Sequence, residues 1–468
     1  MPLQIHDLVP VDTTAVESKW RRIVTRIPVP ESVPLLMRLR SVEPRSMAGM
    51  PPVVWHEAEG FLVRDPYGNQ WIDLTGGIMI ANSGHANPRI RDAIRRTANG
   101  KLLLTYAFPS MQRLRLLEYL VSLSPIPDSK AILFCAGTEA TECAMLLMRK
   151  HGTQQHKQKT GILSFRGSYH GRTMAAVLAG GAPANTDWLS RGQVSHYQLP
   201  FPFCPQCPWK RTSYQSCGAD CFHDSLRLLE DQGTELETIA GIIFEPLPGW
   251  ATWPIPCDYA RALKAWADRN DVIVAADEVQ TGCGRTGRFF GFEHLGIVPD
   301  LMALGKGVSS SLPVSAVVGR RSLLDMPVPG EMSSTHGGNP LCAAAALANL
   351  SAIVEEGLVE RSARTGQLIL RELEPLKHLF PERILSIHGQ GLFISVHLRQ
   401  PQTGDPDAVL ADQVVHEAVR RGVLMFVTGR GFLKIAPPLS IDPQAAREAV
   451  KVLIQCLSDV VAKDGAHE

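Results

Sequence analysis

Short apolar runs recur through the middle of the chain and predict a parallel sheet. The clearest run is Val272–Ala276, which is rich in β-branched residues and is followed directly by Asp277. A strand that is apolar throughout, rather than alternating, is typical of a sheet that is buried on both faces. The same pattern predicts strands at Ala131–Cys135, Gly161–Phe165, Ala240–Phe244, Leu301–Leu304 and Val314–Gly319, the last as an antiparallel or edge strand.

Helical patterns alternate with these strands. One predicted helix begins at Gly137 and keeps apolar positions through Met148, and another runs from an N-cap at Asp258 to Asp268. Strands that alternate with helices between 131 and 318 indicate an α/β fold with a mostly parallel, doubly wound sheet.

The two ends of the chain differ from its centre. Residues 1–52 are punctuated by proline and suggest an arm or short helices packed on a larger body. Two alternating runs flank a turn within 53–73 and predict a small antiparallel unit. We therefore divide the chain into an arm (1–52), the first part of a small domain (53–105), a large domain (106–345) and the rest of the small domain (346–468).

Composition and charge narrow the classes of function. The chain has 468 residues, and its 47 basic and 46 acidic residues give a formal net charge of +1. The sequence has no basic stripe and no apolar run of membrane length, so we expect neither nucleic-acid nor membrane partners. The N-terminal residues include Asp7 and Asp12 and lack the apolar core of a secretion signal, so we do not expect secretion. Ten cysteines in a chain without such a signal favour a reducing compartment, and we expect the cytoplasm.

An acid and a lysine follow two of the predicted strands. Asp277 ends one strand, and Lys306 stands between two glycines just after the next. Open α/β sheets hold their ligands at the carboxyl ends of strands. A pyridoxal phosphate (PLP) enzyme needs a lysine for a Schiff base and an acid that keeps the pyridine nitrogen protonated. If only these two residues are considered, Lys306 could instead be an ordinary surface lysine that follows a buried strand.

A P-loop is a rival interpretation of Gly305-Lys306, and it fails. The residue that should be the first glycine of the loop is Asp300, and Gly307 stands where a serine or threonine must bind magnesium.

The wider string resembles the signature of class III (ω-type) aminotransferases, which are PLP enzymes of fold type I. It reads ADEVQTGCGRTG from 276 and PDLMALGKG from 299. The resemblance, which extends roughly from 53 to 440, implies a PLP-binding large domain and a small α+β domain from both chain ends. It implies that Lys306 carries the Schiff base and Asp277 pairs with the pyridine nitrogen. Val279 then packs on one ring face, and Gln280 bonds the ring hydroxyl.

Further motifs of the family supply other expected contacts with PLP. Gly137-Thr138 opens a helix, where free N–H groups suit a phosphate. The family usually has two polar residues just before this pair, and Cys135 and Ala136 replace them, so one side-chain contact is expected to be lost.

The triplet Tyr169-His170-Gly171 and the pair Glu245 and Gly249 also match motifs of the family. The resemblance implies that Tyr169 stacks on the ring face opposite the valine, although a strand-end tyrosine could also be core. His85, in an early G-H-x-x-P element, is interpreted as a packing residue.

The string STHGGNP from 334 resembles a family motif whose threonine reaches the cofactor phosphate of the neighbouring subunit. Thr335 takes that position, with His336 as an unusual aromatic. The resemblance therefore implies a homodimer with shared active sites.

Two positions depart from the family pattern where substrate binds. A switch glutamate that many members have after E-P-x-x-G is Trp250 here, and an arginine that clamps the α-carboxylate is Lys434. Arg430, in the loop before Lys434, could substitute in part. A lysine offers one point charge where an arginine offers two parallel hydrogen bonds. These changes weaken the case for a simple amino acid as main substrate.

An insertion at 201–224 contains four cysteines in the spacing C-x2-C-x9-C-x3-C. They are Cys204, Cys207, Cys217 and Cys221. They could hold a structural zinc, with His223 beside them, or they could be reduced thiols packed in a loop. No catalytic metal is implied.

The predicted function is amino transfer between a common amino acid and a carbonyl acceptor, such as an aldehyde of an amino sugar or secondary metabolite. The alternatives are a PLP racemase or epimerase, and an aminotransferase for 4-aminobutyrate, ornithine or a similar ω-amino acid. An inactive relative used as a binding module and a cysteine-based metal module also stay open.

Overall fold

The structure is a computed structural model that describes residues 6–181, 195–210, 217–428 and 430–464. The chain divides into a terminal unit, up to Asn87 and from Gly357 onward, and a central unit, Pro88–Glu356. The sequence placed these divisions at 105/106 and 345/346. The structure places them elsewhere because α3 (Pro88–Asn99) packs against α11 (Pro340–Glu355) inside the central unit.

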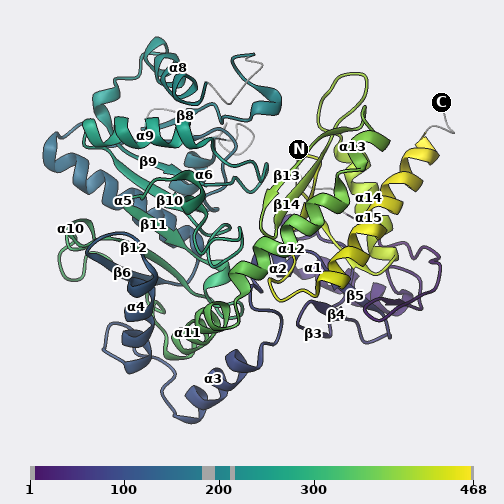
Figure 1. The fold of residues 1–468 in the computed structure, drawn as a ribbon. Helices are drawn as coiled ribbons and strands as arrows, with labels where there is room; N and C mark the ends of the chain where they lie inside the picture. The colour runs from purple at the N-terminus through teal and green to yellow at the C-terminus, as the bar shows by residue number, and fades with distance from the viewer. Residues whose placement is uncertain (1–5, 182–194, 211–216, 429, 465–468) are drawn as a thin grey trace. The chain divides into compact units, whose positions relative to one another are not determined.

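A seven-stranded sheet forms the centre of the central unit, and its strands can be followed across Figure 1. The order is β6 (Ser129–Phe134), β12 (Ser315–Arg320), β11 (Leu301–Leu304), β10 (Ile273–Asp277), β9 (Ile239–Phe244), β7 (Gly161–Phe165) and β8 (His196–Leu199). The strands from β11 to β8 are parallel, which confirms the predicted fold class. β12 is antiparallel to both neighbours and lies inside the sheet, so the edge alternative is wrong.

The helices of this unit alternate with the strands, as predicted. They are α3, α4 (Met111–Leu123), α5 (Gly137–Gln155), α6 (Met174–Gly180), α8 (Gly218–Asp231), α9 (Cys257–Arg269), α10 (Arg321–Leu324) and α11. The predicted N-cap at Asp258 is wrong. The extended backbone of Pro256 directly precedes the first turn of α9, so Asp258 lies inside that turn and pairs with Arg261.

Both faces of the central sheet are buried, which explains the continuous apolar runs. Successive side chains of a strand point to opposite faces, and every residue of β9 and β10 is buried. On one face α5 approaches closely, because Gly241 of β9 has no side chain. A Cβ atom at that position would collide with Met148 of α5.

The terminal unit contains two smaller sheets. The first has the order β1 (Val16–Glu17), β2 (Arg22–Ile23), β5 (Gln70–Asp73), β4 (Leu62–Arg64) and β3 (Glu57–Glu59), with β15 (Val423–Leu424) parallel to β5. The second is antiparallel, in the order β13 (Ile384–Gln390), β14 (Phe393–Leu398), β17 (Phe432–Ile435) and β16 (Phe426–Thr428). The predicted antiparallel unit at 53–73 is thereby confirmed.

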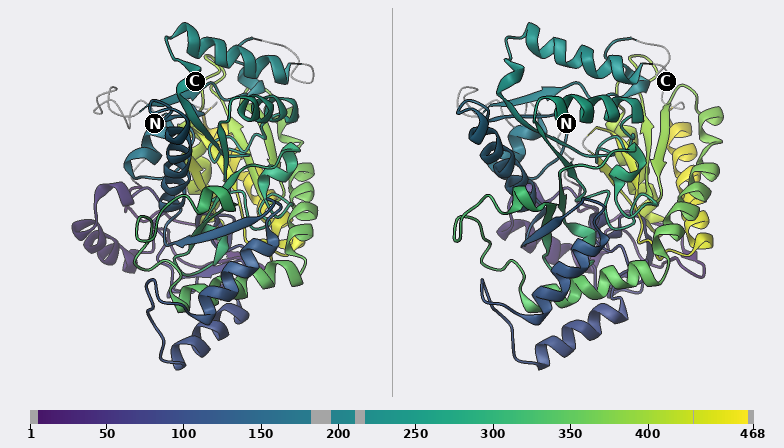
Figure 2. Two further views of the ribbon diagram at one scale, coloured as in Figure 1. Left: turned by 90° about the vertical axis from the view of Figure 1, so that its left-hand side faces the viewer. Right: turned by 60° about the vertical axis from the view of Figure 1, so that its left-hand side comes forward.

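Helices complete the terminal unit. They are α1 (Val33–Val42), α2 (Gly76–Met79), α12 (Leu358–Leu373), α13 (Leu376–Leu379), α14 (Ala408–Arg420) and α15 (Pro443–Asp464). Figure 2 shows α12 and α15, in green and yellow, side by side. His85 Nε2 donates a hydrogen bond to the buried Asp73 carboxylate at 2.7 Å, which agrees with a packing role. Within the described ranges, no single helix is long and apolar enough to cross a membrane.

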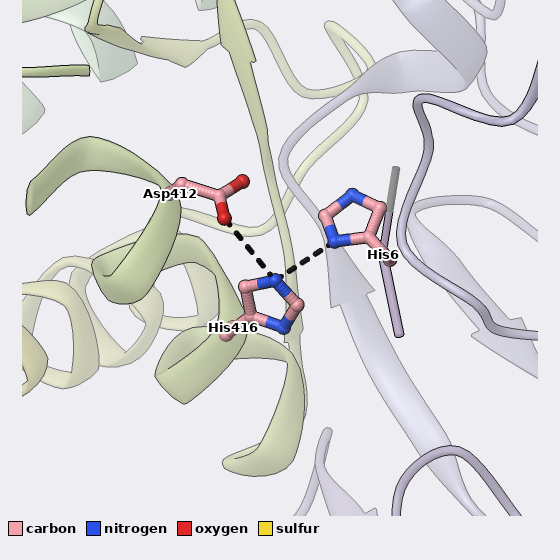
Figure 3. Close-up of side chains that lie close together, drawn as sticks. All are labelled: His6, Asp412 and His416. Atoms are coloured by element: carbon pink, nitrogen blue, oxygen red, sulfur yellow. Dashed lines mark hydrogen bonds and ion pairs between the residues drawn. The ribbon is translucent and has the colours of Figure 1, made fainter. Parts of the chain in front are cut away.

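The N-terminal arm is fastened to α14 by a group of three side chains (Figure 3). His6 Nδ1 lies 2.8 Å from His416 Nε2, and the same nitrogen lies 3.3 Å from Asp412 Oδ2. Burial lowers the pKa of His6, and the neighbouring His416 lowers it further, against the opposing charge of Asp412. Two ring nitrogens at this separation share one proton, so the group is a hydrogen-bonded clasp.

Acidification is expected to loosen this clasp. The pKa of docked His6 lies below its ordinary value of 6.5, so the docked arm binds fewer protons than the free arm. Docking is therefore strongest above that value and weakens as the pH falls below it. The pKa of Asp412 is lowered from 3.8, so this carboxylate stays ionised over the range of the test.

Hydrogen exchange of residues 7–12 should accelerate between about pH 7.5 and about pH 5.5, after correction for intrinsic exchange. In His6→Gln, which keeps a hydrogen-bonding side chain but does not titrate, the corrected rate should no longer change over this range. An unchanged pH response in that variant would refute the assignment to His6.

Candidate active site

Asp277 and Lys306 lie beyond the ends of two neighbouring parallel strands. Asp277 is the last residue of β10 and pairs with Ala303 of β11, and Lys306 follows three residues later. Lys306 has a left-handed backbone with φ of 40°, which costs a residue with a side chain about 1 kcal/mol or more. Strain of this kind persists only where the surrounding structure holds it, and it concentrates at functional sites.

The environment of Lys306 favours a reactive amine. Burial lowers the pKa of its ammonium, while the negative charges of Asp277 and Glu245 oppose that shift. A lowered pKa increases the fraction of neutral amine, which is the form that acts as nucleophile and base. Lys306 Nζ also lies 5.9 Å from the centroid of the Tyr169 ring, which is 44% exposed. The structure thus brings together Lys306, Asp277, Glu245 and Tyr169, which the sequence singled out at separate places in the chain.

His170 holds the Asp277 carboxylate in place. Its Nδ1 lies 2.7 Å from Asp277 Oδ2, and the other carboxylate oxygen accepts the N–H of Val279 at 3.0 Å. Burial alone would lower the pKa of His170, but the hydrogen bond and charge of Asp277 outweigh burial and raise it. A proton on Nδ1 is therefore favoured, and its hydrogen bond orients the Asp277 carboxylate.

Glu245 joins three loops around the same acid. One of its oxygens accepts the N–H of Tyr169 at 2.8 Å, and the other accepts the N–H of Gly249 at 2.8 Å. Gln280 Nε2 lies 3.4 Å from that second oxygen. Burial raises the pKa of Glu245, and the charge of Asp277 adds to that effect. Glu245 therefore orders the loops that carry Tyr169 and Gln280.

Two glycines allow the side chain of Val279 to pack closely against the backbone. A Cβ atom on Gly137 would lie 3.0 Å from Val279 Cγ1, and one on Gly305 would lie 3.2 Å from the same atom. The N–H groups in the first turn of α5, including those of Gly137 and Thr138, precede any intrahelical acceptor. A helix of this length has a positive end there, so an anion is favoured next to Val279.

Glu139 and Glu142 support this turn, and the sequence analysis missed both. The Glu139 carboxylate accepts the N–H groups of Cys135 and Ala136 and the hydroxyl of Ser334, all within 3.0 Å. Glu142 accepts the hydroxyl of Thr173, whose oxygen lies 2.6 Å from that of Thr138. A glutamate in the third position of a helix is a known capping signal, so Glu139 could have been found from the sequence.

Thr335 lies next to this network and is exposed. The preceding Ser334 is bound to Glu139, and its carbonyl accepts the N–H of Gly337 at 3.0 Å. Asn339 then caps α11, because its side chain accepts the N–H of Leu341 at 3.0 Å. The segment is thus held on both sides of an exposed threonine hydroxyl.

Trp250 is part of an aromatic group in the central unit. Its ring centroid lies 5.6 Å from that of Phe201 and 5.4 Å from that of Phe203, both edge to face. Phe203 also lies edge to face with Trp253, at 5.5 Å. These contacts fix the plane of the indole on the loop that follows Gly249.

Lys434 and Arg430 belong to the terminal unit. Lys434 is on β17 and is only 2% exposed, with its Nζ 4.9 Å from the centroid of the Phe393 ring and 5.8 Å from that of Phe426. Such cation–π contacts stabilise a lysine charge that is removed from water. Arg430 is half-buried in the turn that leads into β17.

Comparisons with known proteins agree with one another. A family model described as aminotransferase class-III matches residues 44–457. A 4-aminobutyrate aminotransferase of Mycobacterium leprae is 31% identical over 452 residues, which cover 95% of this chain and all of that protein. A leucine/methionine racemase of Thermococcus litoralis is 31% identical over 414 residues, covering 87% of this chain and 91% of that protein. The solved ornithine aminotransferase of Toxoplasma gondii is 25% identical, with a TM-score of 0.79, covering 92% of this chain and 95% of that one.

Proposed function

Because this chain belongs to the class III aminotransferases, which depend on PLP, we propose that it moves an amino group from a common amino acid to a carbonyl acceptor, with Lys306 and Asp277 as its catalytic residues. The observation that carries these assignments is the buried acid and the low-pKa lysine at the ends of adjacent parallel strands. When bound, the cofactor supplies an aldehyde carbon and an electron sink.

The described residues fit this cofactor. Lys306 offers an amine in a state that can bind the aldehyde carbon and can afterwards move a proton on Nζ. Asp277, whose carboxylate His170 orients, would pair with the pyridine nitrogen and favour its protonated form. Gly137 and Thr138 would bind the phosphate through the first turn of α5.

The ring would lie between two side chains. Val279, which packs closely against Gly137, would cover one face of it, and Tyr169 would stack on the other. Gln280, next to Glu245, would bond the ring hydroxyl. These contacts orient the ring, whereas proton transfer belongs to Lys306.

The proposed substrate is larger than a simple amino acid. Trp250 presents a fixed indole where many family members have a carboxylate switch, so the loop offers apolar surface and one donor. Lys434, in the position of the clamp arginine, cannot form two parallel hydrogen bonds with a carboxylate. We assign the acceptor to aldehydes on amino sugars or secondary metabolites. The donor is an amino acid such as glutamate or alanine, with Lys434 or Arg430 meeting its carboxylate.

Specificity constants test this assignment. We expect an amino sugar to be preferred over 4-aminobutyrate, ornithine and a simple diamine, each assayed with the same keto acid. The contrary result is a hundredfold preference for one ω-amino acid, about 2.7 kcal/mol. That result would contradict the proposed substrate and would favour an ω-amino acid, as in the names of the 4-aminobutyrate and ornithine aminotransferases among the relatives.

Racemisation or epimerisation is the second candidate, and the racemase among the relatives is the observation that favours it. It would use the same Lys306 and Asp277 but would need a base on each face of the ring. Incubation of enantiopure amino acids without any keto acceptor separates the two reactions. A transaminase stops after half a cycle, whereas a racemase continues to equilibrium.

The enzyme is proposed to be a homodimer whose partner subunit's threonine completes each phosphate site. Thr335 is exposed, and the hydrogen bonds of Ser334 and Asn339 anchor the segment on either side of it, as expected for a residue that faces a partner. Its cytoplasmic location, expected from the sequence, stays a prediction.

Mixing two defective chains is expected to restore activity. In a mixture of Lys306→Ala and Thr335→Ala chains, random exchange should rebuild about a quarter of the sites with both residues intact. Activity of the mixture should therefore exceed the mean of the two variants measured separately, and the gain should require a refolding or dissociation step. Full activity of a monomer at high dilution would contradict the shared site.

A further inference from the structure

Four cysteines of the insertion, which the proposed reaction does not use, converge on one small cavity of the central unit. They come from two places in the chain and line its wall together with Pro202, Phe203, Pro208, Gly218, Pro256 and Tyr259. We propose that this cavity is a structural zinc site in which Cys204, Cys207, Cys217 and Cys221 are the four ligands. Residues 211–216 of the insertion lie outside the described part of the chain, and none of them is a proposed ligand.

The two pairs of cysteines lie on two short elements that border the same cavity. Their four sulfur atoms do not all lie within 4.8 Å of one another, so a bound ion would draw the two pairs together. Cys204 opens a short 3-10 turn (Cys204–Gln206), and Cys207 directly follows it. Cys217 is the N-cap of α8, and Cys221 lies one helical turn later, with its N–H donating to Cys217 O at 2.8 Å. Cys204 and Cys207 have two residues between them, and Cys217 and Cys221 have three. Both spacings are typical of ligand pairs in structural zinc sites.

The size of the cavity favours an ion over an organic ligand. Its volume is about 40 Å³, whereas sites for small molecules usually measure about 300–1,000 Å³. The wall is otherwise made of proline, glycine and aromatic residues, which offer little to bind a polar molecule. Zinc prefers thiolates that are shielded from water, and four of them satisfy its tetrahedral geometry.

The four thiols border one small cavity, so their charges would repel one another if all four lost their protons. Four thiolates together are unfavourable without a cation, and a divalent cation reverses that balance by replacing their protons. The positive end of α8 also favours thiolates at its first turn.

The zinc would stabilise the insertion against the core and the Trp250 loop. Helix α8 packs tightly on the start of α9, since a Cβ atom on Gly218 would lie 2.9 Å from Asp258 Cβ. Phe203, in the wall of the cavity, contacts both Trp250 and Trp253. The ion would therefore tie the turn and α8 to the loop that we assign to substrate binding. The zinc proposal itself does not depend on that assignment.

Metal analysis of the full-length, cofactor-loaded protein tests the site. The protein is purified with a thiol reductant and without chelators, and mass spectrometry of the metals should find about one zinc per chain. Cys217→Ser should lose most of this zinc. Cys257→Ser, which removes an exposed cysteine outside the cavity, should keep it. Less than about a tenth of an equivalent in the wild-type chain, even after incubation with zinc alone, would overturn the proposal. Full retention of zinc in Cys217→Ser would do the same.

Two measurements on the wild-type chain remain decisive if Cys217→Ser fails to fold. Alkylation with iodoacetamide, mapped by peptide mass, should spare the four cysteines until a strong chelator is added and should modify them afterwards. Cobalt in place of zinc should give the intense visible bands of a tetrahedral thiolate site. Recovery of the four cysteines as two disulfides from the native protein, or their equal alkylation with and without chelator, would refute a zinc site.

Discussion

Replacing Lys306 with alanine is expected to lower kcat by at least about 10⁴-fold, more than 5 kcal/mol of barrier. The variant loses both the amine that binds the cofactor's aldehyde carbon and the base that moves the substrate proton. The proposed phosphate contacts at Gly137 and Thr138 would remain, so the variant should still bind the cofactor, more weakly. The measurement is a single-turnover assay with an amino-acid donor, together with the mass of the borohydride-treated protein.

Lys130→Ala is the matched control. Lys130 is on β6 and forms an exposed ion pair with Asp325, so its loss removes a lysine from the same sheet without touching the site. The control should transaminate at the wild-type rate and gain the mass of the reduced cofactor, whereas the Lys306 variant should do neither. Normal turnover in Lys306→Ala would show that another residue forms the Schiff base. A wild-type chain that also fails to gain the mass would support a binding module in place of an enzyme.

Asp277→Asn should have the second-largest effect, a loss of roughly 10²- to 10³-fold in kcat, or about 3–4 kcal/mol. A neutral amide cannot hold the pyridine nitrogen protonated, so it no longer stabilises the charge that develops on the ring. The change also removes the charge that raises the pKa of His170. The variant should therefore show both a lower rate and a shifted pH profile, and its Km for the donor should change much less than kcat.

Asp258→Asn provides the comparison for this substitution. Asp258 pairs with Arg261 on the exposed side of α9, and the same chemical change there should leave kcat within about twofold of the wild type. A nearly normal rate in Asp277→Asn would contradict the proposal that this carboxylate holds the pyridine nitrogen protonated. In that case the buried pair of Asp277 and His170 would be a structural feature of the sheet edge.

Local patterns predicted six of the seven strands of the central sheet, all except β8. Two strands, β7 and β11, have the bounds that the apolar runs predicted, because a buried strand is marked by its own residues. The antiparallel hairpin of β4 and β5 was likewise marked by its turn. The predicted helix start and domain boundary differ from the structure where the surrounding structure sets them. The N-cap of α9 fell on Pro256, and α3 joined the central unit through its packing on α11.

The active site was predicted only in part, because motifs identify residues without stating their partners. The sequence singled out Asp277, His170 and Glu245 separately. It gave no sign that His170 would bond Asp277 across 107 positions, or that Glu245 would accept the N–H of Tyr169 across 76. These contacts form because β7, β9 and β10 are neighbours in the sheet and end at the same edge.

The sequence by itself indicated the alternation of strands and helices along the central part of the chain and the motif of the family, since each depends on residues close together in the chain. Only the tertiary structure decided which loops meet. It put β12 inside the sheet, surrounded Lys306 with the charges that oppose its lowered pKa, and gathered four cysteines from a turn and a helix around one cavity. The physical reason is that burial and charge act through space, and distances through space follow from strand order and helix packing.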